Sequence, residues 1–421
     1  MKEVKDLDLK ICKYKFKKFI LYIESEEFEV ESKFISELVI EKEFEDYIHP
    51  YIYTIFSVPN RIYRKMRENA NKLKVHLTLK TGKFRQDDIA DFTEKPPEED
   101  FINQNFKLVI AESSPILNTE FQEAIEEQLE LENDTGNPQH TTNLVALLYN
   151  DDNLRACQAI CNKVVTQCTL TDALTKELQE AGFKNVLLSP ATNETMYSEF
   201  MMLPTRADES IYHICNDYGI HNEGTMIFFD YDINYLIRMN GLCTAWRPRE
   251  IKKTYVIFNP NVLNGRITQG CYRDDEEKVN YVTMQECKMV EASAFINENY
   301  ATNFISLDTK SGESVNKISD TTTFPNRSKT PNVLLKANSG NPNTSEAVKK
   351  WAESQKTNWN VVIDSIDLNM MTPNKEFQLV FISSKLSKYS GTYRIRALYA
   401  SFKKSDGDWF TATVNAQFTG V

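Results

Sequence analysis

Residues 182–190 read Gly182-Phe-Lys-Asn-Val-Leu-Leu-Ser-Pro190, and an apolar patch follows at Phe200-Met-Met-Leu-Pro204. Three further pieces complete the stretch: Ile211-Tyr-His-Ile-Cys-Asn-Asp-Tyr-Gly219, Gly224-Thr-Met-Ile-Phe-Phe-Asp-Tyr-Asp232 with Tyr235-Leu-Ile, and Gly241-Leu-Cys-Thr-Ala245. None of these pieces is a catalytic motif. Their order is what distinguishes them: an apolar run ending in Ser-Pro, a patch ending in Pro, a segment ending in Tyr-Gly, and two apolar runs around a pair of aspartates.

Two helix starts are marked in the middle of the chain. Thr169-Leu-Thr-Asp172 and Thr205-Arg-Ala-Asp208 each place an acidic residue three positions after a threonine, which is close to a capping box. The first predicts a helix over Leu170–Ala181 that ends at Gly182. The second predicts a helix over Ala207–Tyr218 that ends at Gly219. The apolar stripe of this second helix comprises Ile211, Ile214, Cys215 and Tyr218, and the apolar runs Thr225–Phe229 and Asn234–Arg238 predict a hairpin.

The first 80 residues predict antiparallel strands and one helix. Apolar and charged residues alternate with a period of two, which predicts strands with one solvated face. This alternation covers Cys12–Phe16, Phe28–Val30, Leu38–Ile40 and Val75–Leu79, and Tyr51–Val58 is a further strand candidate. Between them, Asn60–Lys72 changes to the helical spacing of Ile62, Met66 and Leu73, with Asn60 as a candidate cap.

Residues 82–167 are less regular. Asp91–Asp100 is predicted to be a loop, Glu120–Leu131 an acidic helix and Asn133–Thr142 a turn-rich connector. Leu144–Tyr149 predicts a strand that returns to the first sheet. Ala156–Gln167 predicts either another such strand or a helix.

The last third of the chain is rich in strands. Tyr255–Phe258 predicts one strand, and residues 306–345 are predicted to form a long polar loop or an excursion because they are rich in Ser, Thr, Asn, Lys and Pro. Ser345–Gln355 predicts a short helix with Ala347 and Trp351 on one face. Four more strands are predicted at Val361–Leu368, Phe377–Ile382, Gly391–Ser401 and Trp409–Phe418.

Composition limits the class of protein. A chain of 421 residues suggests two to three domains, and 41% hydrophobic residues suffice for packed cores. A net charge of −11 argues against a protein that grips a phosphate backbone. No apolar run approaches the roughly 18 residues of a membrane span, and the first residues lack an apolar signal core, so we expect neither a membrane helix nor export. The eight cysteines are then expected to be reduced and buried.

Two motifs resemble metal sites incompletely. Asp230-x-Asp-x-Asn234 imitates the start of a calcium loop, but the sixth position, which must be glycine, is Tyr235. A hairpin turn is therefore the favoured interpretation. Cys157-x-x-x-Cys161 and Cys168 lack the second Cys/His pair that a structural zinc site needs, which favours buried thiols.

No other residues point to catalysis. His213, Cys215 and His221 straddle a helix and its end, and we expect them to have packing or surface roles. The motifs Gly-x-Ser-x-Gly, His-Glu-x-x-His, the P-loop and Gly-x-Gly-x-x-Gly do not occur, and no carboxylate pair stands out among the 60 acidic residues. The sequence therefore predicts no catalytic, cofactor-binding or metal-binding residues, no cofactor and no enzyme.

Acidic residues in the predicted N-terminal strands are open to two interpretations. They are Glu27, Glu29, Glu31, Glu37, Glu41, Glu43 and Glu45. They could form the wall of a pore, or, as we favour, the solvated face of a sheet. A basic cluster follows at Arg61, Arg64, Lys65 and Arg67.

In the order of its pieces, the stretch 182–250 resembles the middle segment of the baseplate hub proteins of long-tailed bacteriophages, especially those with contractile tails. The resemblance returns in Thr372-Pro-Asn-Lys-Glu-Phe377, Lys388-Tyr-Ser-Gly-Thr-Tyr-Arg-Ile395 and Gly407-Asp-Trp-Phe410. It covers most of the chain except residues 82–143 and 306–345.

This resemblance implies a β-rich α+β fold in which two tube-like antiparallel β-domains flank a mixed α/β connecting domain. Residues 1–165 would be the first tube-like domain with a connector, and residues 166–250 the central α+β domain. Residues 251–421 would be the second tube-like domain, with the long polar loop at 306–345.

The resemblance also implies a function. The chain would be a structural virion protein of the tail baseplate, assembled in the host cytoplasm. As a homotrimer, it would present six similar domains, adapt the six-fold tail tube to the three-fold central spike, and line a channel through which DNA only passes. Its partners would be tail tube or tube-initiator proteins, the spike protein and the tape measure protein, with no membrane. The alternatives are a tail-associated cell-wall hydrolase and a peripheral tail or receptor-binding protein.

Overall fold

The structure of the chain is a computed structural model that describes most of the sequence. The described residues are 7–44, 50–85, 97–115, 141–191, 193–221, 225–229, 234–238, 253–263, 266–290, 300–308, 314–318, 328–338, 358–371, 377–383, 385–405 and 408–420. Within them, no helix is both long and apolar enough to cross a membrane.

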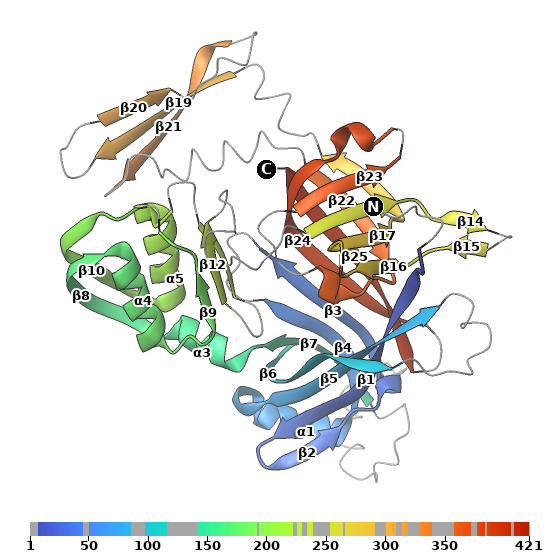
Figure 1. The fold of residues 1–421 in the computed structure, drawn as a ribbon. Helices are drawn as coiled ribbons and strands as arrows, with labels where there is room; N and C mark the ends of the chain where they lie inside the picture. The colour runs from blue at the N-terminus through green and yellow to red at the C-terminus, as the bar shows by residue number, and fades with distance from the viewer. Residues whose placement is uncertain are drawn as a thin grey trace.

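Strands from both ends of the chain close into one antiparallel ring, which we call the closed sheet (Figure 1). In order around the ring, its strands are β1 (Lys10–Ile23), β5 (Lys74–Arg85), β6 (Glu98–Pro115), β7 (Thr141–Tyr149), β4 (Tyr51–Pro59), β3 (Ile35–Glu43), β24 (Gly391–Lys404) and β25 (Trp409–Gly420), and β25 pairs back onto β1. Strand β2 (Glu26–Glu29) pairs with the end of β1, and α1 (Asn60–Glu68) continues directly from β4. The first and last strands of the chain are therefore neighbours.

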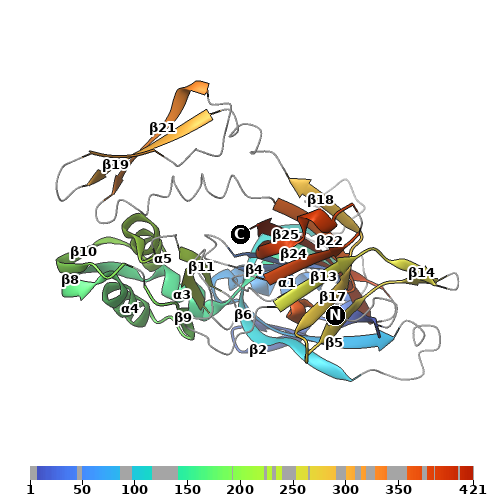
Figure 2. The same cartoon turned by 45° about the horizontal axis from the view of Figure 1, so that its top comes forward.

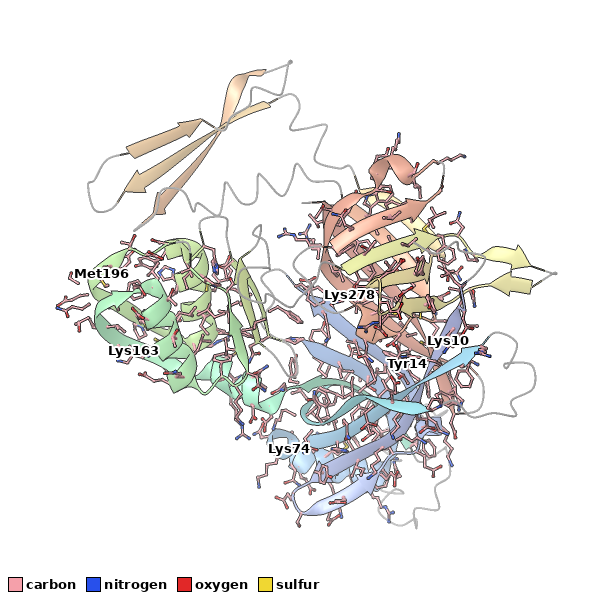
Figure 3. All side chains as sticks on the ribbon, viewed as in Figure 1. Lys10, Tyr14, Lys74, Lys163, Met196 and Lys278 are labelled. Atoms are coloured by element: carbon pink, nitrogen blue, oxygen red, sulfur yellow. The ribbon has the colours of Figure 1, made fainter. Side chains whose placement is uncertain are left out.

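The interior of the closed sheet is packed with side chains. Cys12, Tyr14 and Phe16 alternate into it, which confirms the predicted strand, and Tyr14 is fully buried (Figure 3). The rings of Phe19 and Phe56, from strands β1 and β4 on opposite sides of the ring, lie 5.0 Å apart. Aromatic pairs of this kind add to the stability that area burial provides. The ring thus encloses a hydrophobic core and no lumen.

The sheet continues beyond the ring into the last third of the chain. From β24 it runs through β23 (Phe377–Ile382), β13 (Lys253–Phe258) and β17 (Val279–Thr283) to β16 (Cys271–Asp274), which pairs with β1 at Lys10. From β25 it runs through β22 (Asn358–Asp364) to β18 (Glu286–Val290). The four predicted C-terminal strands are confirmed. The expectation of purely antiparallel strands is wrong for β13, which is parallel to both β17 and β23 because long crossovers connect these strands.

The middle of the chain forms a mixed α/β unit around its own core. Its elements are α3 (Asp151–Gln158), β8 (Ile160–Thr169), α4 (Leu170–Ala181), β9 (Val186–Leu188), β10 (Met196–Arg206), α5 (Ala207–Tyr212), a π-helix (His213–Gly219), β11 (Thr225–Phe229) and β12 (Asn234–Arg238). The predicted strand pair β11–β12 is confirmed as antiparallel, and β9 joins β12 in parallel. Residues 156–167 contain the end of α3 and most of β8, but β8 pairs with β10 and does not return to the first sheet.

One of the two predicted capping boxes forms. Thr169 caps α4, with both hydrogen bonds to Asp172 present, and Gly182 ends the helix at φ 90°. The second capping box does not form, because the cap residue of α5, Arg206, makes no side-chain hydrogen bond that caps the helix. The acidic residue of that motif, Asp208, binds its neighbour Arg206 instead. The helix itself begins at Ala207 as predicted, and the π-helix carries it to the predicted end at Gly219.

Several smaller expectations are corrected. Asn60 is the first residue of α1, and its side chain accepts a hydrogen bond from Thr142. Residues 98–100 belong to β6, a strand that was not predicted. For the polar segment 306–345, the predicted excursion fits the described residues better than the predicted loop does. They hold parts of a separate three-stranded sheet of β19 (Tyr300–Asp308), β20 (Ser314–Ile318) and β21 (Ser328–Asn338), drawn apart from the closed sheet in Figures 1 and 2. The helices predicted over 120–131 and 345–355 lie outside the described residues.

The remaining short elements join these parts. They are the hairpin β14 (Asn261–Leu263) and β15 (Arg266–Thr268), and the 3-10 turns Ser32–Phe34, Ala70–Lys72, Leu368–Met370 and Ser387–Tyr389.

Candidate functional site

The cysteines that were weighed as zinc ligands are buried thiols. Cys157, Cys161 and Cys168 all face the core of the central unit. Cys161 Sγ donates a hydrogen bond to Glu177 Oε2 at 2.9 Å. Burial, followed by this hydrogen bond to a carboxylate, raises the pKa of Cys161 to about 11, so the thiol stays protonated at neutral pH. In the part of the chain that the structure describes, no three His, Cys, Asp or Glu side chains are placed to hold a metal ion.

The structure separates His213, Cys215 and His221. Cys215 is in the core, and His213 packs its ring against Tyr218 at 5.0 Å. His221 is fully buried and has a hydrogen-bond partner at each ring nitrogen. Its Nε2 lies 2.9 Å from Ser189 Oγ, and its Nδ1 lies 2.9 Å from Thr225 Oγ1.

His221 connects two of the sequence pieces within residues 182–250. Ser189 ends the apolar run at 186–189, and Thr225 begins β11. A serine beside a histidine invites comparison with a nucleophile and its base. Here Ser189 is 2% exposed and His221 is 0% exposed, so no substrate can reach the hydroxyl. The contact is structural, and no pattern of residues around His221 indicates that this particular histidine is buried.

We expect His221→Ala to lower the free energy of unfolding by about 2–5 kcal/mol, because it leaves a cavity and removes a partner from each of two buried hydroxyls. Urea denaturation followed by circular dichroism measures the loss. His76→Ala is the control: His76 lies on the outer side of β5 and contacts Asn105 and Thr78 there. Equal losses in the two variants would contradict the structural role of His221.

The calcium-like motif has one described residue. Asn234 Nδ2 donates hydrogen bonds to Lys184 O at 2.8 Å and to Asn153 Oδ1 at 3.1 Å. Its side chain therefore ties the start of β12 to α3. Asp230 and Asp232 lie outside the described residues.

The outer side of β4 and its neighbouring strands in the closed sheet forms an apolar surface, which we call the β4 face. Strand β4 alternates strictly, so Tyr51, Tyr53 and Ile55 point outward while Ile52 and Phe56 enter the core. Strand β7 repeats this pattern, with Val145, Leu147 and Tyr149 outward. The outward residues of neighbouring strands stand directly opposite each other: Ile55 with Val145, Tyr53 with Leu147 and Val39, and Tyr51 with Tyr149.

Exposed Val109 of β6 extends this apolar surface beyond β7, because it pairs with Leu147. A sheet with one covered face ordinarily carries polar residues on its other face. The β4 face departs from that rule, since both sides of β4 and β7 are apolar. Strands with apolar residues on both sides are typical of sheets that are covered on both faces. This pattern is present in the sequences 51–59 and 141–149, so it could have indicated this surface before the structure was known.

Tyrosine hydroxyls at one margin of the β4 face bind acidic residues of β3. Tyr51 OH donates to Glu41 Oε2 at 2.7 Å, and Tyr399 OH donates to Glu43 Oε1 at 2.8 Å. Partial burial and then the hydrogen bond to Glu41 raise the pKa of Tyr51 to about 12, so its hydroxyl is uncharged at neutral pH. Burial likewise raises the pKa of Tyr149. The face is thus apolar, with acidic residues of β3 at one margin and Glu112 of β6, paired with Val145, at the other.

The acidic residues with two interpretations, a solvated sheet face or a pore wall, lie in two places. Glu37, Glu41 and Glu43 lie at the margin of the β4 face, whereas Glu27 and Glu29 are exposed on β2. Glu31 pairs with Lys33 at 2.8 Å, and Glu45 lies outside the described residues.

The basic cluster predicted after β4 is the surface of α1. Arg61, Arg64 and Arg67 are exposed there, and Lys65 pairs with Glu26 at 2.6 Å.

Comparisons with known proteins find one matching family and several structures with a similar fold. A family model described as "Bacteriophage PBS1 gene 109 protein" matches residues 8–415. Among solved structures, the tail protein from Neisseria meningitidis MC58 is 9% identical with a TM-score of 0.52, and the match covers 96% of each chain. The lidded Francisella PdpA-VgrG complex contains a chain that is 8% identical with a TM-score of 0.51, covering 98% of this chain and 53% of that one. At these identities the likeness is one of fold. No curated protein matches the sequence significantly.

Proposed function

The chain belongs to the family of the Bacteriophage PBS1 gene 109 protein, and from that premise we propose that it is a structural protein of a phage tail, the hub of the baseplate. In this proposal three copies form a ring in the virion, assembled in the host cytoplasm. Each copy then contributes two tube-like units, built mainly from residues 1–150 and 251–421, which share the closed sheet. The mixed α/β unit connects them, and it begins at α3 rather than at the predicted residue 166. The ring adapts the six-fold tail tube to a three-fold spike.

The β4 face is the observation that carries this proposal. Its apolar side chains lie outside the core cluster of their own chain, so a neighbouring subunit is the partner that would remove them from water. The packed interior of the closed sheet supports the same arrangement. Because one chain encloses no lumen, a channel for DNA has to form between subunits.

Similar folds in tail proteins support the placement in the tail. The Neisseria meningitidis structure is described as a tail protein, and the Francisella structure as a complex of PdpA with VgrG. Tail tube or tube-initiator proteins, the spike protein and the tape measure protein are the neighbours this proposal implies. The role is structural rather than catalytic, which agrees with the burial of the hydrogen-bonded pair Ser189 and His221.

Light scattering and electron microscopy of the purified protein test the proposal. We expect a mass of three chains and a three-fold ring with a central opening. A protein that stays monomeric, even when it is co-expressed with its neighbouring tail proteins, would contradict it.

The assembled ring is expected to let duplex DNA pass without retaining it, because the chain carries a net charge of −11 and phosphates are repelled by acidic walls. An electrophoretic mobility assay at low salt measures retention where electrostatic attraction is strongest. Tight binding that disappears as salt is raised would contradict an acidic channel and would direct attention to the exposed arginines of α1.

A further inference from the structure

A second apolar surface lies on the central unit, on a different sheet from the β4 face. Six large apolar side chains are exposed in the described part of the chain, and four of them belong to β8 and β10. These four are Ile160 (72% exposed), Val164 (53%), Met196 (64%) and Met201 (63%). Apolar residues gathered on one face mark an interaction site more often than scattered ones do.

The geometry of the strand pair produces this surface, which we call the β8–β10 face. One side of the pair packs on α4 and α5 through Cys161, Val165 and Phe200. On the other side, Val164 and Met201 remain exposed among the described residues. Val164 and Met201 stand directly opposite each other in the register, and Met196 lies at the outer end of β10 (Figure 3). Methionine side chains adapt to partners of different shape.

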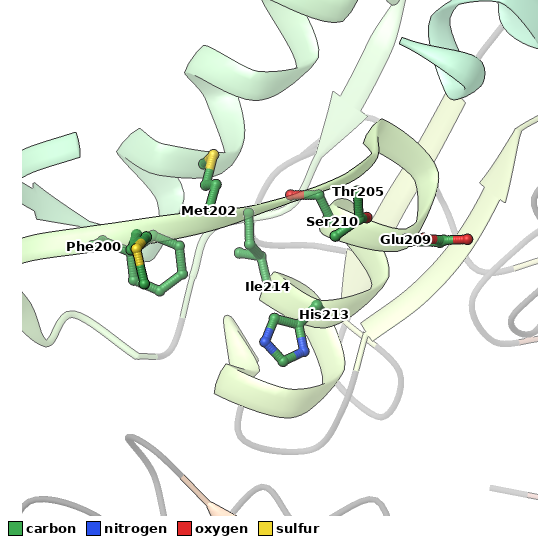
Figure 4. Close-up of a pocket in the computed structure, with 8 residues that line it drawn as sticks. Phe200, Met202, Thr205, Glu209, Ser210, His213 and Ile214 are labelled. Atoms are coloured by element: carbon green, nitrogen blue, oxygen red, sulfur yellow. The ribbon is translucent and has the colours of Figure 1, made fainter. Parts of the chain in front are cut away.

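A cavity of about 200 Å³ opens beside this face, between β10 and the helices that follow it (Figure 4). Its lining consists of Phe200, Met201, Met202, Thr205, Glu209, Ser210, His213 and Ile214. An apolar cavity of roughly 150 Å³ holds a benzene molecule, so this cavity is large enough for one leucine or phenylalanine side chain. Met201 borders both the cavity and the β8–β10 face, which makes the two continuous.

The charges around the cavity and the face are predominantly acidic. Glu199 is exposed two positions before Met201, on the same side of β10, and Glu209 lies at the cavity. The nearby cations, Arg206 and Lys163, are each paired with carboxylates. The Arg206 guanidinium is bound by the buried carboxylate of Asp208, and its Nε lies 4.0 Å from Glu209. Lys163 Nζ lies 3.1 Å from Glu177 and 2.6 Å from Glu180. A partner segment with lysine or arginine beside its apolar residues would complement these charges.

We propose that the β8–β10 face and its cavity bind a basic amphipathic segment of a partner protein. One apolar side chain of that segment enters the cavity, others cover Val164 and Met201, and its basic residues face Glu199 and Glu209. The site is separate from the β4 face, so it does not depend on the proposed ring.

Fluorescence polarisation with two labelled peptides tests the proposal on the full-length protein. One peptide alternates leucine with lysine, and the other alternates leucine with glutamate. The lysine peptide is expected to bind better. Val164→Ser/Met201→Ser is expected to weaken its binding about tenfold or more, because anchors in a pocket dominate such interfaces. Glu199→Lys/Glu209→Lys is expected to reverse the preference between the peptides.

Ile382→Ser is the matched control, since Ile382 is 40% exposed on β23, which belongs to a different sheet from β8 and β10. It should leave peptide binding unchanged, and none of the variants should change the mass of the assembly. The proposal is overturned if the lysine peptide does not bind, if both peptides bind equally, or if Val164→Ser/Met201→Ser binds as the unaltered protein does. Loss of assembly with peptide binding intact would count against the proposed ring and not against this site.

Discussion

The Ile55→Glu variant is expected to be folded and monomeric. Ile55 points outward from the middle of β4, between Glu37 of β3 and Val145 of β7. A carboxylate there remains hydrated in the single chain, so the fold tolerates it. In an assembly that covers the β4 face it would be buried without a partner, at a cost of about 3 kcal/mol or more per interface. That cost weakens association by about two orders of magnitude.

Ile20→Glu is a closely matched control. Ile20 is also an outward-facing, partly buried isoleucine of the closed sheet, on β1. Strand β1 is four positions from β4 in either direction around the ring, which places the two substitutions on opposite sides. Light scattering should show a monomer for Ile55→Glu and the full assembly for Ile20→Glu, with similar circular dichroism. If both variants assemble, or if both are monomeric, the β4 face is not the specific interface.

The second large effect concerns the two ends of the chain. A fragment of residues 1–165 is expected not to fold by itself, because the closed sheet takes two of its strands, β24 and β25, from the C-terminal end. Those strands contribute the following large side chains to the core: Tyr393, Ile395, Leu398, Phe402, Phe410, Val414 and Phe418. At about 1.5–3 kcal/mol for each buried side chain, their loss rivals the whole stability of a typical domain.

Near-ultraviolet circular dichroism and limited proteolysis of the fragment check this expectation. The fragment should give no cooperative thermal transition and should be digested rapidly. Co-expression with residues 251–421 should restore protection, because that piece supplies both missing strands. Cooperative unfolding of residues 1–165 alone would show that the first unit is independent of the last strands.

Local structure could be predicted from the sequence wherever neighbouring residues specify the pattern. The alternation around Tyr14 predicted β1, because successive side chains of a strand point to opposite sides whatever the strand pairs with. The Thr169–Asp172 capping box predicted the start of α4, since both of its hydrogen bonds are closed within one turn. The similar motif at Thr205 does not form a capping box, because the Asp208 carboxylate binds Arg206 instead.

The neighbours of each strand, and the face that each strand buries, depend on the complete fold and could not be predicted from local patterns. The pairing of Lys13 with Thr411 joins the two ends of the chain, and nothing local to either strand encodes it. Strand β4 is apolar on both sides, so its sequence identified a strand but could not tell Phe56, in the core, from Ile55, on the outer face. The burial of His221 likewise depends on three segments that meet in space. A local pattern fixes backbone conformation through contacts within a few residues, whereas the choice of core face and partner strand depends on the apolar area that the whole fold removes from water.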